Sequence, residues 1–279
     1  MQQAVPATLI ATIPHSGEWI PPEAFWLKSL SPSVLLMDVD RFVDRLFAPA
    51  LQEFKVANVV ARAHRYAVDL NRTPDDIDAG TVQGAPLVEG THTKGFHWAK
   101  TTQGQAILNA PLSMELHQKL IELYNDPFHL EISRLVNQAR ANDPKRQIFH
   151  LDCHSMPSQG TAAHADTGAR RPDVVISDFE GKSSRPDFVA LIVQAFTRAG
   201  LRVSINWPYK GGRITQRYGK PAQGHHTVQI ELNRALYMNE STREAKPQEF
   251  ASLQDTLRQV LGEVDAFVRG AAPAAPKHD

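Results

Sequence analysis

Histidine and carboxylate residues follow the apolar runs of this sequence at positions where they could bind a metal ion. His15 and Glu18 form a His-x-x-Glu pair just after the apolar segment 8–13, and His154 follows the segment 148–152. Two imidazoles and one carboxylate form a ligand set with which catalytic zinc sites leave a fourth position for water. We therefore predict that His15, His154 and a carboxylate bind zinc or another divalent metal ion.

Two acidic residues compete for the carboxylate position. Glu18 has a suitable spacing from His15, whereas Asp40 lies in the segment Asp38-Val-Asp40, at the start of an amphipathic stretch. Asp40 could instead stabilise the start of a helix, where negative charge is favourable. Both residues remain candidates. Asp152, two residues before His154, could orient a ligating imidazole through a hydrogen bond.

Glu231 is the candidate proton carrier. It ends the apolar segment Val228-Gln-Ile-Glu, where a carboxylate is costly unless it has a partner. Next to a metal-bound water, such a carboxylate can take a proton and later pass it to the leaving amine. A salt bridge to Arg234 is the alternative. Cys153 adjoins His154, but adjacent residues on a strand point to opposite faces, so we expect Cys153 to be buried packing.

Three arginines and two glycines are candidates for binding an anionic substrate. Arg65, Arg72 and Arg213 could bind carboxylates, because a planar guanidinium donates two parallel hydrogen bonds to such a group. Gly211 and Gly212 allow the backbone to approach a ligand closely. A phosphate-binding loop is the competing interpretation, but the sequence has no Walker pattern and no Gly-x-Gly-x-x-Gly that enters a helix.

The elements that must position these residues alternate between strands and helices. Apolar runs predict strands over 8–13, 56–62, 148–152, 173–177, 202–206 and 226–232, and helical spacing predicts helices over 33–54, 112–141, 185–199 and 247–268. This order predicts an α/β three-layer sandwich with a mixed, mostly parallel central sheet. Ligands of such sheets bind outside the carboxyl ends of the strands, and the polar clusters lie at those ends.

The remaining segments are predicted to be irregular. Residues 73–110 lack clean periodicity, and we expect this stretch, with His92, His97 and Trp98, to shape a substrate pocket. Residues 207–224 are predicted to form a glycine-rich loop. We expect a single catalytic domain over 1–270 and a flexible tail over 271–279.

Composition excludes several classes of protein. The 279 residues contain 30 Lys+Arg and 30 Asp+Glu, which argues against a nucleic-acid partner bound through a basic surface. One cysteine excludes an intrachain disulfide, a zinc ribbon and a thioredoxin-like site. No apolar run approaches the ~20 residues that span a bilayer, and no signal peptide is evident, so we expect a cytoplasmic protein without a membrane partner. The oligomeric state is left open.

Several short motifs together resemble the N-formylglutamate amidohydrolase family. They are Pro-His-Ser-Gly at 14–17, Asp40 with the Val-Asp that follows, Asp-Leu-Asn-Arg at 69–72, Asn-Asp-Pro-Phe-His at 125–129, Asp-Cys-His-Ser at 152–155, Arg-Pro-Asp at 171–173, Tyr-Lys-Gly-Gly at 209–212 and Gln-Ile-Glu-Leu-Asn-Arg at 229–234. They occur in the family's order, and the resemblance covers roughly residues 10–240. Phe128 replaces the tyrosine of the family's Pro-Tyr-His segment.

The resemblance carries expectations about fold and site. The family is related to the zinc carboxypeptidase and aspartoacylase group, which implies a phosphorylase/hydrolase-like fold of the zinc-peptidase kind. His15 and His154 match the metal-binding histidines, and Glu231 matches the catalytic glutamate. Asn71 and Arg72 match a pair that holds a substrate carboxylate, whereas Arg65 falls one residue short of the spacing of the arginine that polarises the scissile carbonyl.

The same resemblance bears on the choice of carboxylate ligand. Asp40 fits the aspartate pattern of the family, whereas the wider group uses the carboxylate at the position of Glu18.

These observations lead to an expected activity. We expect a zinc-dependent amidohydrolase that acts on a linear amide, N-formyl-L-glutamate, and gives formate and L-glutamate, with a role in histidine degradation. The alternatives are another zinc hydrolase on this fold, such as an N-acyl-amino-acid deacylase or a carboxypeptidase, or a metal-free binding protein. Metal content separates the last class from the enzymes, and a substrate panel separates the enzymes from one another.

Overall fold

A six-stranded sheet forms the centre of the protein, in a computed structural model that describes residues 7–85 and 94–270. Its strands are β1 (Ala7–Ile13), β2 (Ala57–Val60), β3 (Gln147–Met156), β4 (Val174–Ser177), β5 (Val203–Ile205) and β6 (His225–Asn233), in the order β2-β1-β3-β6-β4-β5. β2, β1, β3 and β6 are parallel, whereas β4 runs antiparallel to β6 and β5 runs parallel to β4. The predicted mixed, mostly parallel sheet is confirmed, with a strand in each of the six predicted places.

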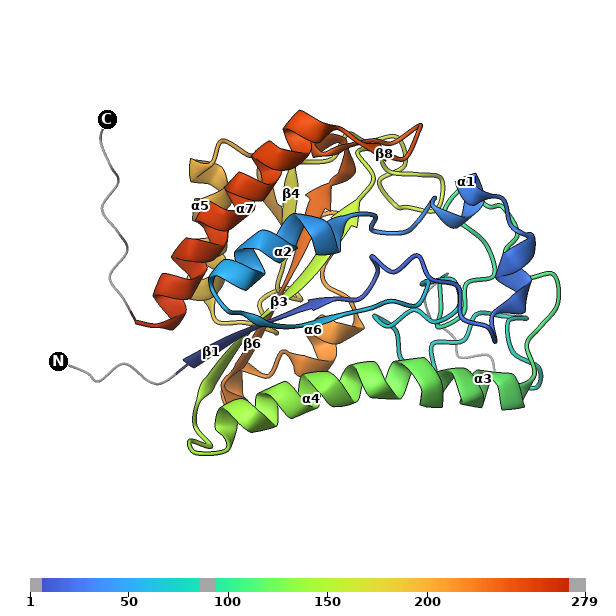
Figure 1. The fold of residues 1–279 in the computed structure, drawn as a ribbon, viewed down its shortest axis with the longest axis horizontal. Helices are drawn as coiled ribbons and strands as arrows, with labels where there is room; N and C mark the ends of the chain where they lie inside the picture. The colour runs from blue at the N-terminus through green and yellow to red at the C-terminus, as the bar shows by residue number, and fades with distance from the viewer. Residues whose placement is uncertain (1–6, 86–93, 271–279) are drawn as a thin grey trace.

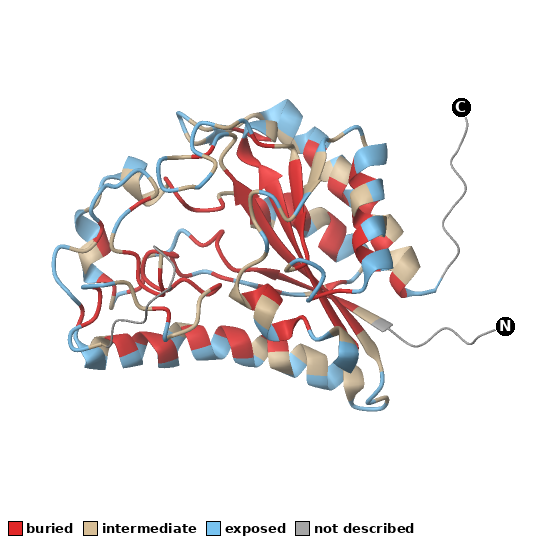
Figure 2. Ribbon diagram, turned by 180° about the vertical axis from the view of Figure 1, so that it is seen from behind, coloured by how far each residue is buried: buried red, intermediate tan, exposed pale blue. Residues whose placement is uncertain are grey.

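Helices cover both faces of this sheet, as the three-layer prediction requires (Figure 1). One face packs against α2 (Val43–Glu53), α5 (Pro186–Arg198) and α7 (Pro247–Val268). The other face packs against α3 (Met114–Leu120), α4 (Asp126–Arg140) and α6 (Arg213–Tyr218). Because apolar side chains cover both faces, the central strands are buried throughout, as Figure 2 shows. Polar side chains on these strands therefore need specific partners.

The helix predicted over 33–54 is broken in the structure. It consists of α1 (Pro32–Leu35) and α2, and the residues between them form a loop that contains Asp38 and Asp40. The backbone N–H of Asp40 donates to the carbonyl of His15 at 3.0 Å, and Phe42 takes a left-handed conformation with φ of 71°. Asp40 therefore lies before the helix, not in its first turn, which is contrary to the alternative that it stabilises a helix start.

The other long helix is nearly continuous. α3 and α4 are joined by a π-helical turn over Ile121–Asn125, and Pro127 lies in the first turn of α4. A proline lacks the N–H that an inner turn needs, and the wider turn accommodates this loss without ending the helix.

Several short elements were not predicted from the sequence. The segment 207–224, expected to be a loop, contains α6 and a 3₁₀ turn at Pro221–Gln223. Further short elements are 3₁₀ turns at Phe25–Ser29 and Arg234–Leu236 and a hairpin of β7 (Met238–Asn239) and β8 (Glu244–Ala245).

Loops gather beyond the carboxyl ends of the four parallel strands, on the right of Figure 1. The segments after β1 and β2 and the irregular residues of 73–110 build most of this region, and residues 86–93 and the predicted tail at 271–279 lie outside the described structure. Within the described ranges, no helix combines the length and the apolar character that a membrane span needs.

Candidate active site

A cavity of about 440 Å³ opens at the carboxyl ends of the parallel strands. Nine of the residues predicted to bind metal, carry the proton or bind substrate line it: His15, Asp40, Arg65, Asn71, Arg72, His154, Gly211, Gly212 and Glu231. They come from segments far apart in the chain, and the parallel arrangement of β1, β2, β3 and β6 brings those segments to one edge.

His15, Asp40 and His154 form a buried group at this cavity that could hold a metal ion. Asp40 Oδ2 lies 3.0 Å from His154 Nδ1 and 3.5 Å from His15 Nδ1, and the possible donor atoms all lie within 4.8 Å of one another. All three side chains are buried. Two imidazole nitrogens and one carboxylate oxygen fit a zinc ion that keeps a position open for water.

Two further carboxylates orient the imidazoles of this group. His15 Nε2 donates to Asp69 Oδ1 at 2.7 Å, and His154 Nε2 lies 3.0 Å from Asp152 Oδ2. These contacts turn the Nδ1 atom of each ring toward Asp40, as metal-binding histidines require. The structure gives Asp152 the position expected from its spacing. Asp69 was not assigned a role from the sequence, although it lies in the quoted Asp-Leu-Asn-Arg motif.

The charges around His15, Asp40 and His154 stabilise a cation between the two imidazole rings. Burial alone would raise the pKa of Asp40, but hydrogen bonds from His15 and His154 hold it well below its usual value. Burial would likewise lower the pKa of His154, yet the Asp152 carboxylate raises it well above its usual value. His154 therefore sits between two carboxylates that stabilise positive charge, either as a proton on its ring or as a bound metal ion.

Glu18 lies outside this group. Its carboxylate pairs with Arg41 Nε at 2.8 Å, and its side chain is 41% exposed. The structure therefore contradicts the expectation that Glu18 could be a metal ligand: in the bend after β1 its side chain turns away from His15. Asp40, which the backbone hydrogen bond to His15 draws in, occupies the carboxylate position.

Glu231 lies opposite His154 across the β3–β6 pair and is buried in the cavity wall. Burial raises its pKa to about 7, and the charge of Asp40 adds to the rise. Its Oε1 accepts a hydrogen bond from Gln229 Nε2 at 2.8 Å. A carboxyl group that titrates near neutral pH can both accept and return a proton.

Arg234 has a different partner from the one that the sequence suggested. Its guanidinium pairs with Asp40 Oδ1 at 2.9 Å and donates to Ser155 Oγ at 3.1 Å. The salt bridge to Glu231, considered as an alternative role for that residue, does not form. Arg234 instead fixes one oxygen of Asp40 and leaves the other oxygen facing the two histidines.

Asn71 and Arg72 stand beside the metal-binding group. Asn71 Nδ2 lies 3.2 Å from His154 Nε2, and Asn71 Oδ1 accepts from the N–H of Ile214 at 2.7 Å. Arg72 donates to two backbone carbonyls, those of Lys94 and Asn71, at 2.6 and 2.8 Å. These contacts hold the guanidinium at the cavity wall, and no carboxylate of the described residues forms a salt bridge with it.

Arg213 does not line the cavity, contrary to the prediction that it binds substrate. Its Nε donates to Asp76 Oδ2 at 2.8 Å, and that carboxylate is buried. Asp76 therefore neutralises the charge of Arg213, and this ion pair joins α6 to the irregular segment after β2.

The two glycines allow close packing behind Asn71. A Cβ atom on Gly212 would meet Asn71 Nδ2 at 2.3 Å, so the loop could not lie against Asn71 with any other residue there. Gly211 has φ of 112°, a conformation that favours glycine. The N–H of Gly212 donates to Gln229 Oε1 at 2.7 Å, which links this loop to the neighbour of Glu231.

Arg65 lines the cavity, but its guanidinium is heavily engaged. It pairs with Asp69 Oδ2 at 3.0 Å, lies 3.7 Å from Asp40 Oδ1 and stacks over the Trp98 ring at 4.5 Å. Arg65 therefore contributes positive charge beside the metal-binding group.

The irregular segment contributes to the cavity only in part. Trp98 lines the wall, as expected, whereas His97 is buried away from it. His97 Nδ1 donates to the carbonyl of Ala67 at 2.6 Å, and its Nε2 shares a hydrogen bond with His117 Nδ1 at 2.9 Å. His92 lies outside the described residues. Lys94 and Tyr209 also line the cavity, and sequence reasoning assigned no role to either.

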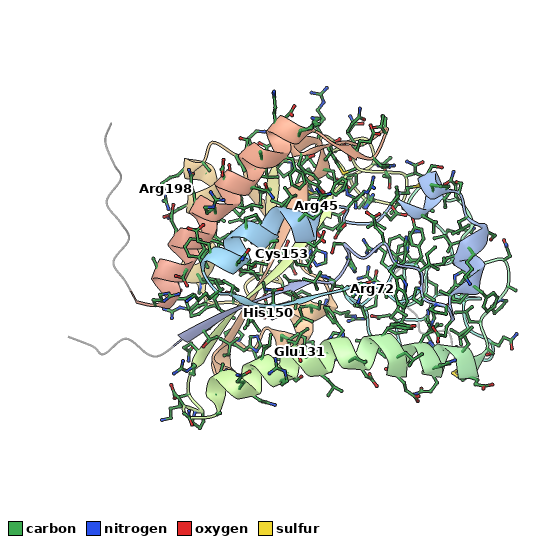
Figure 3. All side chains as sticks on the ribbon, in the orientation of Figure 1. Arg45, Arg72, Glu131, His150, Cys153 and Arg198 are labelled. Atoms are coloured by element: carbon green, nitrogen blue, oxygen red, sulfur yellow. The ribbon has the colours of Figure 1, made fainter. Side chains whose placement is uncertain are left out.

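Cys153 is buried packing, as its place on the strand predicted. It lies in the core shared with α2, apart from the loops that carry Arg72 (Figure 3), and burial raises the pKa of its thiol well above the usual value. A protonated, inaccessible thiol cannot serve as a nucleophile.

Comparisons with known proteins agree on one family. Residues 7–238 match the family model described as N-formylglutamate amidohydrolase. The chain is 30% identical over 260 residues to an N-formylglutamate deformylase of Pseudomonas aeruginosa, covering 92% of this chain and 90% of that protein. It is 28% identical to an N-formylglutamate deformylase of Pseudomonas putida, covering 91% and 90%. The crystal structure of an N-formylglutamate amidohydrolase from Ralstonia eutropha superimposes with a TM-score of 0.85 at 29% identity, covering 96% of each chain.

Proposed function

The chain belongs to the N-formylglutamate amidohydrolase family, and we propose that it hydrolyses the amide bond of N-formyl-L-glutamate to formate and L-glutamate. The observation that supports this activity best is the placement of Glu231 opposite His154, beside the buried His15–Asp40–His154 group. A proton-carrying carboxyl group and a metal-binding group in one cavity are what hydrolysis of an unactivated amide needs.

His15, Asp40 and His154 would hold a zinc ion in this proposal. Their atoms fit the ion by type and by spacing, and Asp69 and Asp152 orient the two rings toward Asp40. When bound, zinc would supply Lewis acidity, which lowers the pKa of a bound water and polarises the formyl carbonyl.

Glu231 carries the proton in the reaction that we propose. Its carboxylate takes a proton from the attacking water as the new C–O bond forms at the formyl carbon. The same proton then passes to the amide nitrogen as the C–N bond breaks, so that glutamate leaves as an amine. Arg65 stabilises the negative charge that develops on the formyl oxygen, because it places positive charge beside the site.

Asn71 and Arg72 bind the α-carboxylate of the substrate. The α-carboxylate is attached to the carbon that carries the reacting nitrogen, so it must bind close to the reacting centre. Asn71 is suitably placed for this, because it lies beside His154. Gly211 and Gly212 support this arrangement, since they let the α6 loop pack behind Asn71.

Replacing Arg72 with alanine tests this assignment. Removing one charged partner of a desolvated ion pair costs about 2–5 kcal/mol of binding free energy. We therefore expect kcat/KM for N-formylglutamate to fall by about 30-fold to several thousand-fold. Arg72→Lys should restore only part of the loss, because an ammonium cannot donate two parallel hydrogen bonds. Steady-state formate release measures the effect at equal metal content.

The matched control is Arg217→Ala, which removes an exposed arginine of α6 and should change kcat/KM little. A side-by-side assay of N-formylglutamate and N-formylglutamine tests the substrate itself, because the second compound keeps the shape and lacks one charge. An enzyme directed to glutamate prefers the first strongly. Equal kcat/KM for the two compounds would instead favour a general N-acyl-amino-acid deacylase.

A further inference from the structure

Among the described residues, five lysine and arginine side chains line the cavity, and three of them are paired with carboxylates. Arg65 pairs with Asp69 at 3.0 Å, Arg234 with Asp40 at 2.9 Å and Lys210 with Glu180 at 2.6 Å. The other two are Arg72 and Lys94. Among the residues that the structure describes, neither forms an ion pair with a carboxylate.

Arg72 and Lys94 form one stretch of the cavity wall. Arg72 Nε donates to the backbone carbonyl of Lys94 at 2.6 Å, and Lys94 Nζ lies 5.7 Å from the centre of the Trp98 ring. Lys94 is half-buried, and burial lowers its pKa, with Asp38 and Asp78 acting in the opposite direction. An ammonium partly withdrawn from water gains most from an anion that enters the cavity.

We propose that Lys94 binds the side-chain carboxylate of the substrate and sets the preference for an acidic amino acid. This inference rests on the proposed function, in which N-formylglutamate brings two carboxylates to a cavity where Arg72 and Lys94 have no carboxylate partner among the described residues. Asn71 ties Arg72 to the reacting centre, so Arg72 receives the α-carboxylate. The side-chain carboxylate lies two methylene groups further out, and Lys94 is the adjacent cation on the same wall.

The assignment makes a prediction about selectivity. Lys94→Gln should lower kcat/KM for N-formylglutamate by about 10- to 100-fold, mainly through KM, because one ion pair to the substrate is lost. The same variant should change kcat/KM for N-formylglutamine by less than about 3-fold, since that compound offers Lys94 no charge. Lys94→Arg should keep most of the preference, because the positive charge remains. Arg72→Ala, in contrast, should weaken both substrates alike.

Lys210→Gln is the matched control, because it removes a lysine that lines the same cavity but is paired with Glu180. It should leave the ratio of kcat/KM for the two substrates unchanged. Calorimetric binding of both compounds to metal-loaded Glu231→Gln protein, with and without Lys94→Gln, measures the preference without hydrolysis.

The outcomes separate the two proposals. If the ratio of kcat/KM for N-formylglutamate to that for N-formylglutamine falls strongly in Lys94→Gln and not in Lys210→Gln, the result supports the role of Lys94. A preference for N-formylglutamate that survives in Lys94→Gln, or an equal loss for both compounds, overturns it. A Lys94-dependent binding preference in a protein that releases no formate would support Lys94 and overturn the proposed hydrolysis.

Discussion

Glu231→Gln should lower kcat for formate release by about 10²–10⁴-fold, the usual effect of removing a general base, while KM changes little. Glutamine has nearly the same shape as glutamate, so the hydrogen bond with Gln229 and the packing of β6 can be kept. It cannot accept the proton of the attacking water. Steady-state kinetics with N-formylglutamate, together with metal analysis and thermal unfolding of the same preparations, measures the effect.

An exposed glutamate provides the control for this substitution. Glu122→Gln, which changes an exposed side chain on the π-helical turn, should leave kcat unchanged. If Glu231→Gln keeps the kcat of the unchanged protein with metal bound, Glu231 has a structural role. Gln229 would then be its partner, since Arg234 is committed to Asp40.

His154→Ala should remove most of the bound metal and, with it, the activity. Asp40→Asn should weaken metal binding by roughly 10-fold or more, because the two histidines lose the charged oxygen that faces them. Glu18→Ala is the matched control and should leave metal affinity unchanged, since its carboxylate pairs with Arg41 at the surface. Metal content after dialysis, measured by elemental analysis, reports each effect.

Folding must be checked in parallel for the Asp40 variant. Breaking a buried ion pair typically costs about 3–5 kcal/mol, and Asp40→Asn leaves Arg234 without its carboxylate. Circular dichroism and unfolding midpoints show whether the metal is lost from a folded protein. Full metal content in a folded His15→Ala, His154→Ala double variant would rule out the site.

The strands and long helices could be predicted because burial alone determines their pattern. β3 and β6 are buried throughout, and their apolar residues alternate with polar ones at the period of a strand. The break between α1 and α2 could not be predicted, because apolar residues continue at helical spacing through Leu36 and Val39. A contact with a distant segment, from the N–H of Asp40 to the carbonyl of His15, determines the break.

The sequence predicted those residues of the candidate site whose positions follow from the order and direction of the strands alone. His15, His154 and Glu231 come together because each lies at or just after the end of a parallel strand. Spacing could not separate Glu18 from Asp40, since the choice depends on how the bend after β1 turns. Arg213 was misplaced because its partner Asp76 is 137 residues away in the chain, and Lys94 carries no sequence signal of its own.

The most direct test of metal-assisted deformylation measures metal content and formate release in the same preparations. The purified protein is stripped with a chelator, reconstituted with increasing amounts of zinc and assayed with N-formylglutamate. Formate and glutamate should appear mole for mole, at a rate that rises with bound metal up to about one ion per chain. A metal-free protein that releases formate at the full rate, or a metal-loaded protein that releases none, would contradict it.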